Sequence, residues 1–170
     1  MNSNQTGSRP SWDLYGMSMA YAASLRSQDP FVKVGAAAFR EDHSIAATGY
    51  NGAPPGIEIS WSNREERRKY VCHAELNCLR HVRPGEAKTI YVTLSPCAEC
   101  IKTIGAFGIT RVVFNEVYSR DTAAFDIASV YGISMKQLKF DATEYYKTYD
   151  HNNHYRIHEP LQGKQSGLGI

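Results

Sequence analysis

The sequence predicts an α/β fold: a three-layer α/β/α sandwich with helices on both faces of a five-stranded mixed sheet. Three observations lead to this fold class. Strand-like and helix-like segments alternate along the chain, a short polar turn joins the first two strand-like segments, and helix-like segments separate the later ones. Strands joined by a tight turn pair antiparallel, whereas strands joined through a helix cross over and pair in parallel. The two kinds of connection together predict a mixed sheet.

The N-terminal part is expected to form one helix followed by a β-hairpin. The helix is expected over residues 12–27. Apolar residues recur there at helical spacing: Leu14, Met17, Tyr21 and Leu25. Residues 31–39 and 44–50 are expected to be strands, because a polar turn at 40–43 joins the two runs. Residues 64–69 carry a dense run of charges of both signs, which we expect to form a solvated helix or loop surface.

The middle of the chain is expected to alternate helix, strand and helix. A helix is expected over residues 74–81, and a short β-branched strand over residues 89–94. The next helix should open at Ser95 and Pro96, because serine is a favoured N-cap and proline is tolerated at the first helical position. This helix would place two cysteines, three positions apart, on one face.

The C-terminal part is expected to complete the sheet. Residues 110–114 and 133–138 are expected to be strands, and residues 121–131 a helix between them. Residues 141–157 are rich in tyrosine and histidine and should be helical in their first half. Three histidines there have the spacing of a helical metal site: His151, His154 and His158. No acidic residue or cysteine lies close in sequence, so surface or interface packing is the favoured interpretation of these histidines.

Length and composition agree with one compact domain. The chain has 170 residues, of which 42% are hydrophobic, enough to fill a core. We expect a flexible N-terminus at 1–11, a single domain at 12–158 and a mobile C-terminal tail at 159–170. Neither a secretory signal nor a membrane segment is expected, and four cysteines give no disulfide framework, which predicts a cytoplasmic protein. The net charge of +2 gives no general electrostatic case for nucleic-acid binding.

Two short motifs carry the chemistry: His73-Ala74-Glu75, and Pro96-Cys97-Ala98-Glu99-Cys100 further along. A catalytic zinc site has three protein ligands and leaves one position to water, and His73, Cys97 and Cys100 supply three. Zinc lowers the pKa of bound water to about 7, so hydroxide becomes available without a strong base. Glu75 is then free to move protons. This pattern is the signature of zinc deaminases that act on cytosine or adenine, in which the glutamate is the acid/base.

The spacing of the first motif constrains its local structure. On a regular helix of 3.6 residues per turn, His73 and Glu75 would point about 200° apart. Both can face one water only at the start of a helix. The motifs are therefore expected to meet at the starts of two helices.

Other kinds of cysteine site remain as alternatives. A lone Cys-x-x-Cys is often half of a structural zinc ribbon or a redox pair. Cys72 could complete a closed structural site, but its neighbour His73 leaves it little reach, and Glu75 and Pro96 would then have no role. We expect Cys72 and Cys78 to pack as small apolar residues.

Over residues 12–138 the chain resembles the deoxycytidylate deaminases of the cytidine deaminase superfamily. The resemblance includes the two zinc motifs, Ser24-Leu25-Arg26-Ser27-Gln28-Asp29-Pro30, Val34-Gly35-Ala36, and Gly49-Tyr50-Asn51-Gly52-Ala53-Pro54-Pro55-Gly56. Cytidine deaminases and tRNA adenosine deaminases share the zinc motifs, but they usually lack the Gly-Tyr-Asn-Gly loop together with an asparagine at the position of Asn77. The resemblance implies a cytidine-deaminase-like fold and hydrolysis of dCMP to dUMP and ammonia, which supplies dUMP for thymidylate synthesis.

The resemblance also implies a set of site residues. Glu75 would be the catalytic acid/base, and His73, Cys97 and Cys100 would hold one Zn²⁺ per chain. No second zinc is expected, since residues 57–71 contain neither cysteine nor histidine. The substrate-binding residues would be Asn51 at the sugar and phosphate, Ala74 and Ser95 at the base, and Arg26, Tyr118 and Arg120 at the phosphate.

Family members are typically homohexamers activated by dCTP and inhibited by dTTP. An effector site here would include Gly52 and Gly56, and Mg²⁺ would accompany a triphosphate effector. Alternatives of other classes remain at this point. They are a deaminase of dCTP, of free cytidine or of a tRNA adenosine, a catalytically silent zinc-stabilised binding module, and a nucleic-acid-binding module that stacks bases. The last would use clustered tyrosines: Tyr145, Tyr146, Tyr149 and Tyr155.

Overall fold

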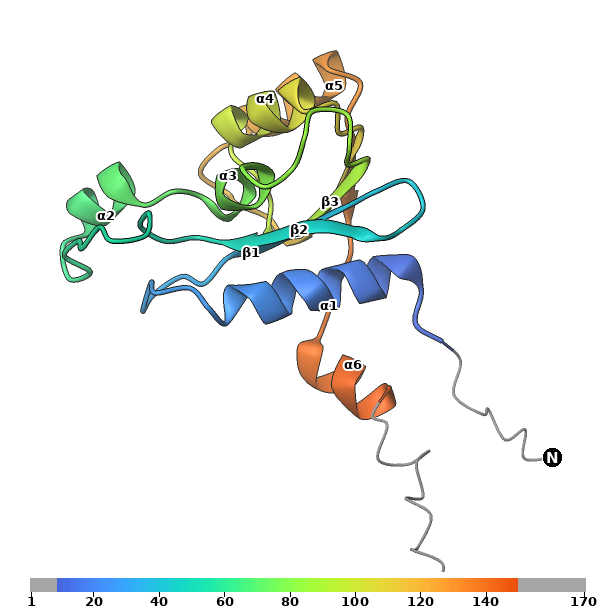
Figure 1. Ribbon diagram of the computed structural model, residues 1–170, viewed down its shortest axis with the longest axis horizontal. Coiled ribbons are helices and arrows are strands. Elements are labelled where there is room, and N and C mark those ends of the chain that lie inside the picture. Colours follow the sequence, from blue (N-terminus) through green and yellow to red (C-terminus); the bar gives the residue numbers. More distant parts are fainter. Residues whose placement is uncertain (1–8, 150–170) are drawn as a thin grey trace, which may run out of the picture.

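The computed structural model describes residues 9–149, and these residues form a five-stranded sheet with helices on both faces (Figure 1). The strand order is β2-β1-β3-β4-β5. Helix α1 (Trp12–Ser24) lies on one face, and helices α3 (Ala74–Leu79) and α4 (Ala98–Ala106) lie on the other. The predicted three-layer α/β/α fold with a mixed sheet is confirmed. The predictions for residues 1–8, for the three histidines His151, His154 and His158, for Tyr155 and for the tail at 159–170 lie outside the described residues.

Strands β1 (Gly35–Phe39) and β2 (Ile45–Tyr50) form the predicted antiparallel hairpin. Its register pairs the first residue of β1 with the last of β2, and it shifts by one residue between Ala38 and Phe39. The predicted first strand begins too early, at residue 31. There Asp29 Oδ1 accepts hydrogen bonds from the backbone N–H groups of Phe31 (2.8 Å) and Val32 (3.1 Å), which hold the chain in a turn.

The second half of the sheet is parallel. Strands β3 (Thr89–Leu94), β4 (Arg111–Glu116) and β5 (Ser134–Gln137) run in one direction, while β3 pairs antiparallel with β1. Helix α4 connects β3 to β4, and helix α5 (Ala123–Val130) connects β4 to β5. These are the predicted crossovers, because a parallel pair needs a connection that returns over the face of the sheet.

The sheet separates two apolar clusters, one on each face. The larger cluster lies under α3, α4 and α5. The smaller lies under α1 and α6 (Ala142–Thr148). Strand β1 contributes to both clusters and is buried along its whole length. The sheet therefore provides a rigid base for the elements that begin at its edge. No helix among residues 9–149 has the length and apolar character needed to cross a membrane.

Helix α2 (Arg64–Tyr70) differs from the other helices because it buries none of its residues. It begins at Asn63, whose side chain accepts hydrogen bonds from the backbone N–H groups of Glu65 and Glu66. Figure 1 shows it to the side of the sheet, away from the two packed layers. Of the two expected forms, a solvated helix or a loop surface, the structure shows the helix.

Candidate active site

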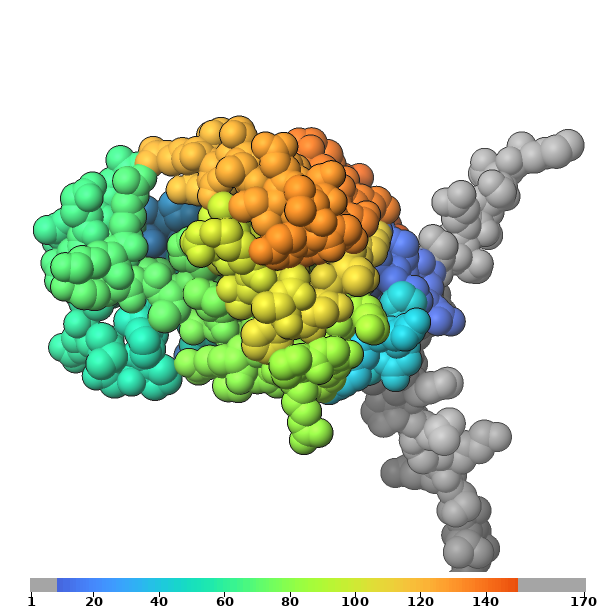
Figure 2. All heavy atoms as spheres, turned by 90° about the horizontal axis from the view of Figure 1, so that it is seen from above, coloured from blue at the N-terminus to red at the C-terminus, as the bar shows by residue number. Residues whose placement is uncertain are grey.

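A pocket of about 450 Å³ opens where three strands end and two helices begin, within the range of about 300–1,000 Å³ usual for small-molecule sites. Seen from above, the surface is hollowed between α2 and the segment that follows β4 (Figure 2). The residues that line the pocket are Asp29, Val32, Val34, Asn51, Arg64, Arg67, Arg68, Val71, His73, Ala74, Glu75, Leu94, Ser95, Cys97, Tyr118 and Arg120.

Two helix starts bring the predicted metal ligands together. His73 is the N-cap of α3, Cys97 is the N-cap of α4, and Cys100 lies in the first turn of α4. The Nδ1 atom of His73 is 3.3 Å from the Sγ of Cys100 and 3.6 Å from the Sγ of Cys97. The three ligand atoms all lie within 4.8 Å of one another.

These distances fit a tetrahedral zinc ion. With Zn–S bonds of about 2.3 Å and Zn–N bonds of about 2.0 Å, two ligand atoms on neighbouring corners of a tetrahedron lie about 3.5 Å apart. The donor set of one imidazole and two thiols is also one that zinc prefers. The geometry and chemistry of these three residues therefore suit a Zn²⁺ ion with one open position.

The two cysteines of α4 differ in their protonation. A hydrogen bond from Cys100, together with one from His73, lowers the pKa of Cys97 to about 4. The same bond to Cys97, together with burial, raises the pKa of Cys100. Cys97 is thus held as a thiolate, the form that binds metal. Among residues 9–149 the cluster of ligand atoms contains neither Cys72 nor Cys78, and burial raises the pKa of the Cys78 thiol to about 12.

Glu75 lies in the first turn of α3 and is almost completely buried, with 4% of its surface exposed. Burial raises the pKa of its carboxyl group, because a charged carboxylate loses its hydration there. Glu75 and His73 line the same pocket. A buried carboxyl group with a raised pKa that lines a pocket is suited to accept and return a proton.

The second motif begins differently from the prediction. Ser95 is not the N-cap of α4; its hydroxyl oxygen accepts a hydrogen bond of 2.7 Å from the backbone N–H of Tyr118. The N-cap is Cys97, and the backbone N–H of Ala98 donates to Asp121 Oδ2 at 2.7 Å. These two bonds tie the segment after β4 to the start of α4, which holds Tyr118 and Arg120 against the pocket.

Asn51 lines the pocket, yet most of its amide is used within the protein. Its Oδ1 accepts from Ser27 Oγ (2.7 Å) and from the backbone N–H of Val34 (2.8 Å), and its Nδ2 donates to the carbonyl of Val32 (2.9 Å). An amide side chain has two acceptor sites and two N–H donors. One N–H remains for a molecule in the pocket, and the other three positions fix the chain before β1.

Most of the predicted site residues lie together. Those that line the pocket are Asn51, His73, Ala74, Glu75, Ser95, Cys97, Tyr118 and Arg120. Cys100 is buried directly behind them. Arg26, Gly52 and Gly56 are not among the lining residues. Arg26 is exposed to solvent, and Gly56 has a positive φ of 79° with no atom within 4 Å of an added Cβ.

Sequence reasoning missed three arginines of α2. Arg64, Arg67 and Arg68 line the pocket, although we expected the whole charged run to face solvent. Their spacing of three and four residues puts them on one face of the helix, a signal that was present in the sequence. Two acidic residues, Glu65 and Glu66, fall on other faces, and their presence made the run look uniformly solvated.

Comparison with known proteins identifies the relatives of this chain. Residues 10–116 match the family model of the cytidine and deoxycytidylate deaminase zinc-binding region. The mouse deoxycytidylate deaminase is 37% identical over 113 residues, which cover 61% of this chain and 64% of the mouse protein. The human deoxycytidylate deaminase is 34% identical over 141 residues, which cover 75% of this chain and 79% of the human protein.

A solved structure shows the same fold. The crystal structure of dCMP deaminase from the cyanophage S-TIM5 in complex with dCMP and dUMP superimposes with a TM-score of 0.66 and 28% sequence identity. The match covers 77% of this chain and 99% of the phage chain.

Proposed function

Because this chain belongs to the cytidine and deoxycytidylate deaminase family, we propose that it hydrolyses dCMP to dUMP and ammonia. One observation supports this activity above the others. The pocket brings the His73, Cys97 and Cys100 ligand atoms within 4.8 Å of one another and places a buried glutamate, Glu75, on the same wall. A closed structural zinc site or a silent binding module would not need that glutamate.

His73, Cys97 and Cys100 would hold Zn²⁺, which when bound supplies an activated water at neutral pH. Glu75 would accept one proton from the attacking water and deliver it to N3 of the cytosine ring. Once the water oxygen has added to C4, Glu75 would take the remaining proton from the new C4 hydroxyl and pass it to the amino group, which leaves as ammonia. The reaction thus balances as dCMP plus water giving dUMP plus ammonia.

Groups around Glu75 would orient the substrate. Ala74 and Ser95 would position the base, and the free N–H of Asn51 would contact the sugar and phosphate end. Tyr118 and Arg120, held by the bonds described above, would lie near the phosphate. The contact of Arg26 with the phosphate stays a prediction, since this residue lies outside the pocket lining.

The expectations about assembly, regulation, a second metal ion and location in the cell also remain predictions. They are the homohexamer, activation by dCTP and inhibition by dTTP at a site with Gly52 and Gly56, Mg²⁺ with a triphosphate effector, and a cytoplasmic location. The open space and positive φ at Gly56 are compatible with a glycine loop that closes over a nucleotide.

A turnover panel tests the proposal. Zinc-loaded protein is assayed on dCMP, dCTP, CMP, deoxycytidine and cytidine, with and without dCTP or dTTP as effectors. Glu75→Gln is the control, because it keeps the shape of the side chain and removes its ability to take up a proton. We expect turnover of dCMP that falls by at least about 100-fold in Glu75→Gln. Absence of turnover on all five compounds would contradict the proposal. A preference for dCTP or cytidine would assign that compound as the substrate in place of dCMP.

A further inference from the structure

We propose that α2 is a phosphate-recognition arm, in which Arg64 and Arg68 bind the 5′-phosphate of the nucleotide opposite Arg120, and Arg67 positions the arm. The inference rests on the proposed function, since it assigns the part of the pocket that distinguishes a nucleotide from a nucleoside. It gives a role to a charged helix that the sequence pattern alone presents as solvated surface.

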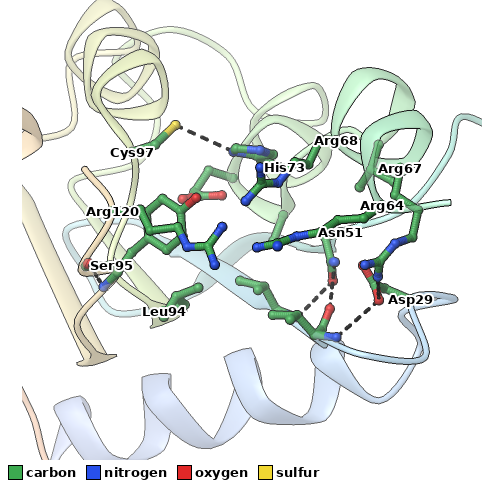
Figure 3. A pocket seen from close by; sticks show the side chains of 16 residues that line it. Asp29, Asn51, Arg64, Arg67, Arg68, His73, Leu94, Ser95, Cys97 and Arg120 are labelled. Carbon is green, nitrogen blue, oxygen red and sulfur yellow. Dashed lines mark hydrogen bonds and ion pairs between the residues drawn. The ribbon is translucent and has the colours of Figure 1, made fainter. Parts of the chain in front are cut away.

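The arginines face one another across the pocket. Figure 3 shows Arg64 and Arg68 reaching from α2 into the pocket, while Arg120 enters from the opposite wall. His73 and Cys97 line the same pocket, and Figure 3 shows them near the three guanidinium groups. An anionic group between the two walls would share the pocket with the metal ligands and Glu75, so a nucleotide whose base faces Glu75 could place its phosphate there.

The charges of these arginines are not neutralised by the protein. Within residues 9–149, Arg64, Arg68 and Arg120 take part in none of the ion pairs, which join other residues. Apart from Asp29 and Glu75, the walls between them carry no acidic group. Asp29 is already paired with Arg67, and Glu75 belongs to the start of α3 beside the metal ligands. Three like charges around one cavity repel one another, and a dianionic phosphate removes that repulsion.

The fourth arginine of the pocket has a different partner. Arg67 forms an ion pair with Asp29 at 2.8 Å, and the two side chains are only 13% and 10% exposed. The guanidinium of Arg67 also lies 4.3 Å from the centre of the Phe31 ring. Asp29 in turn accepts hydrogen bonds from the backbone of the turn before β1. Arg67 is thus fixed on both sides by groups outside its own helix.

This pair can set the position of the whole arm. Because α2 has no buried residue, packing does little to fix it, and the Arg67–Asp29 contact joins it to the turn before β1. Arg64 and Arg68 lie one turn apart on the face next to Arg67. Holding Arg67 therefore aims the two free guanidinium groups into the pocket, so Arg67 and Asp29 act as positioning residues.

Binding of the product tests the arm without relying on turnover. Dissociation constants of dUMP and deoxyuridine are measured by titration calorimetry for the zinc-loaded wild type, Arg64→Ala, Arg68→Ala and the double variant. Loss of one charge-assisted phosphate contact should weaken dUMP binding about tenfold, and loss of both about 100-fold. Deoxyuridine should bind within about twofold of the wild type, because it lacks the phosphate. Lys69→Ala is the matched control, since it removes a positive charge from the same helix at a residue outside the pocket, and it should change dUMP binding less than about twofold.

The positioning role is tested with Asp29→Asn, for which two explanations predict opposite changes in dUMP affinity. Asp29→Asn keeps an oxygen that accepts from Phe31 and Val32 but removes the negative charge that holds Arg67. If Arg67 positions the arm, dUMP binds more weakly and deoxyuridine is unchanged. If only the summed charge of the pocket matters, removing an anion tightens dUMP binding, and that result would overturn the positioning role.

The outcomes separate this inference from the proposed function. Turnover of dCMP by the wild type, with unchanged dUMP binding in the double variant, would refute the arm and leave the activity standing. Equal weakening of dUMP and deoxyuridine would also refute it, because a general distortion of the pocket would then explain the loss. A wild-type protein that neither deaminates dCMP nor binds dUMP would refute both.

Discussion

Gly49 is the position at which the active-site helix α3 rests directly on strand β2. A Cβ atom added at Gly49 would lie 2.3 Å from the backbone N of Cys78 and 2.6 Å from the carbonyl O of Ala74. Both are backbone atoms of α3, so no side-chain rotation relieves the clash. To reach ordinary contact at 3.4 Å, the helix must move from the strand by about 1 Å. Gly49→Ala should therefore displace α3 as a unit.

The displacement should reduce both stability and catalysis. Overpacking costs about 1–3 kcal/mol, and a backbone clash falls at the upper end, which lowers the Tm by about 6–12 °C for a chain of this size. The same movement acts on the site, because His73 and Glu75 belong to the start of α3 whereas Cys97 belongs to α4. A misplacement of about 1 Å can lower kcat by about 100-fold.

The test compares Gly49→Ala with Gly52→Ala in three measurements: thermal unfolding, zinc content by elemental analysis, and dCMP turnover. Gly52, three residues further along the chain, is a matched control, because an added Cβ there has its nearest neighbour at 3.6 Å, an ordinary contact. We expect Gly52→Ala to keep its Tm and zinc. A Gly49→Ala protein with the Tm, zinc content and kcat of the wild type would refute the reasoning that α3 position depends on this glycine.

Three further predictions concern the metal ligands, the sheet and the phosphate. Cys97→Ala should lose zinc together with activity, and elemental analysis that finds one zinc per chain would contradict the ligand assignment. Two hydrogen bonds from Arg111, aided by Lys136, hold the pKa of Asp13 well below its ordinary value of about 3.9. The ionised carboxylate therefore stabilises the fold above about pH 4. This contribution is lost as the pH falls through the lowered pKa. Asp13→Asn should therefore cost about 2–3 kcal/mol in the free energy of unfolding at pH 7, with a difference from wild type that shrinks in acid denaturation series. Arg120→Ala should raise KM for dCMP at least about tenfold and KM for deoxycytidine little, and equal changes for both would count against a phosphate contact.

Local sequence signals were sufficient to predict the pairing of the sheet and the start of α3 at the metal site. The hairpin follows from a polar turn between two apolar runs, and the parallel half follows from helices between strands, both of which depend on neighbouring residues. The position of His73 before a helix follows from its two-residue spacing to Glu75. On a regular helix, two side chains with this spacing cannot both face the same water molecule.

Features set by contacts distant in sequence were not predictable in the same way. Ser95 has the chemistry of an N-cap, but Tyr118, brought beside it by strand β4, uses its hydroxyl. Strand β1 starts later than its apolar pattern indicates, because Asp29 folds the preceding residues into a turn. The arginines of α2 line the pocket through the placement of the helix in space, which its mixed charges do not reveal.

The two ends of the pocket differ in how deeply their residues are built into the fold. At one end, Glu75 lies at the buried start of α3, which packs against the sheet, whereas α2 at the other end contributes no residue to either apolar cluster. Substitutions on α2 away from the Arg67–Asp29 pair therefore carry little stability cost, since surface changes usually alter the free energy of unfolding by less than about 0.5 kcal/mol. With the proposed phosphate contacts on α2, mutational drift there would reshape which phosphorylated nucleosides are accepted while the deaminating chemistry stays fixed, which would make substrate preference the part of this enzyme most open to evolution and to redesign.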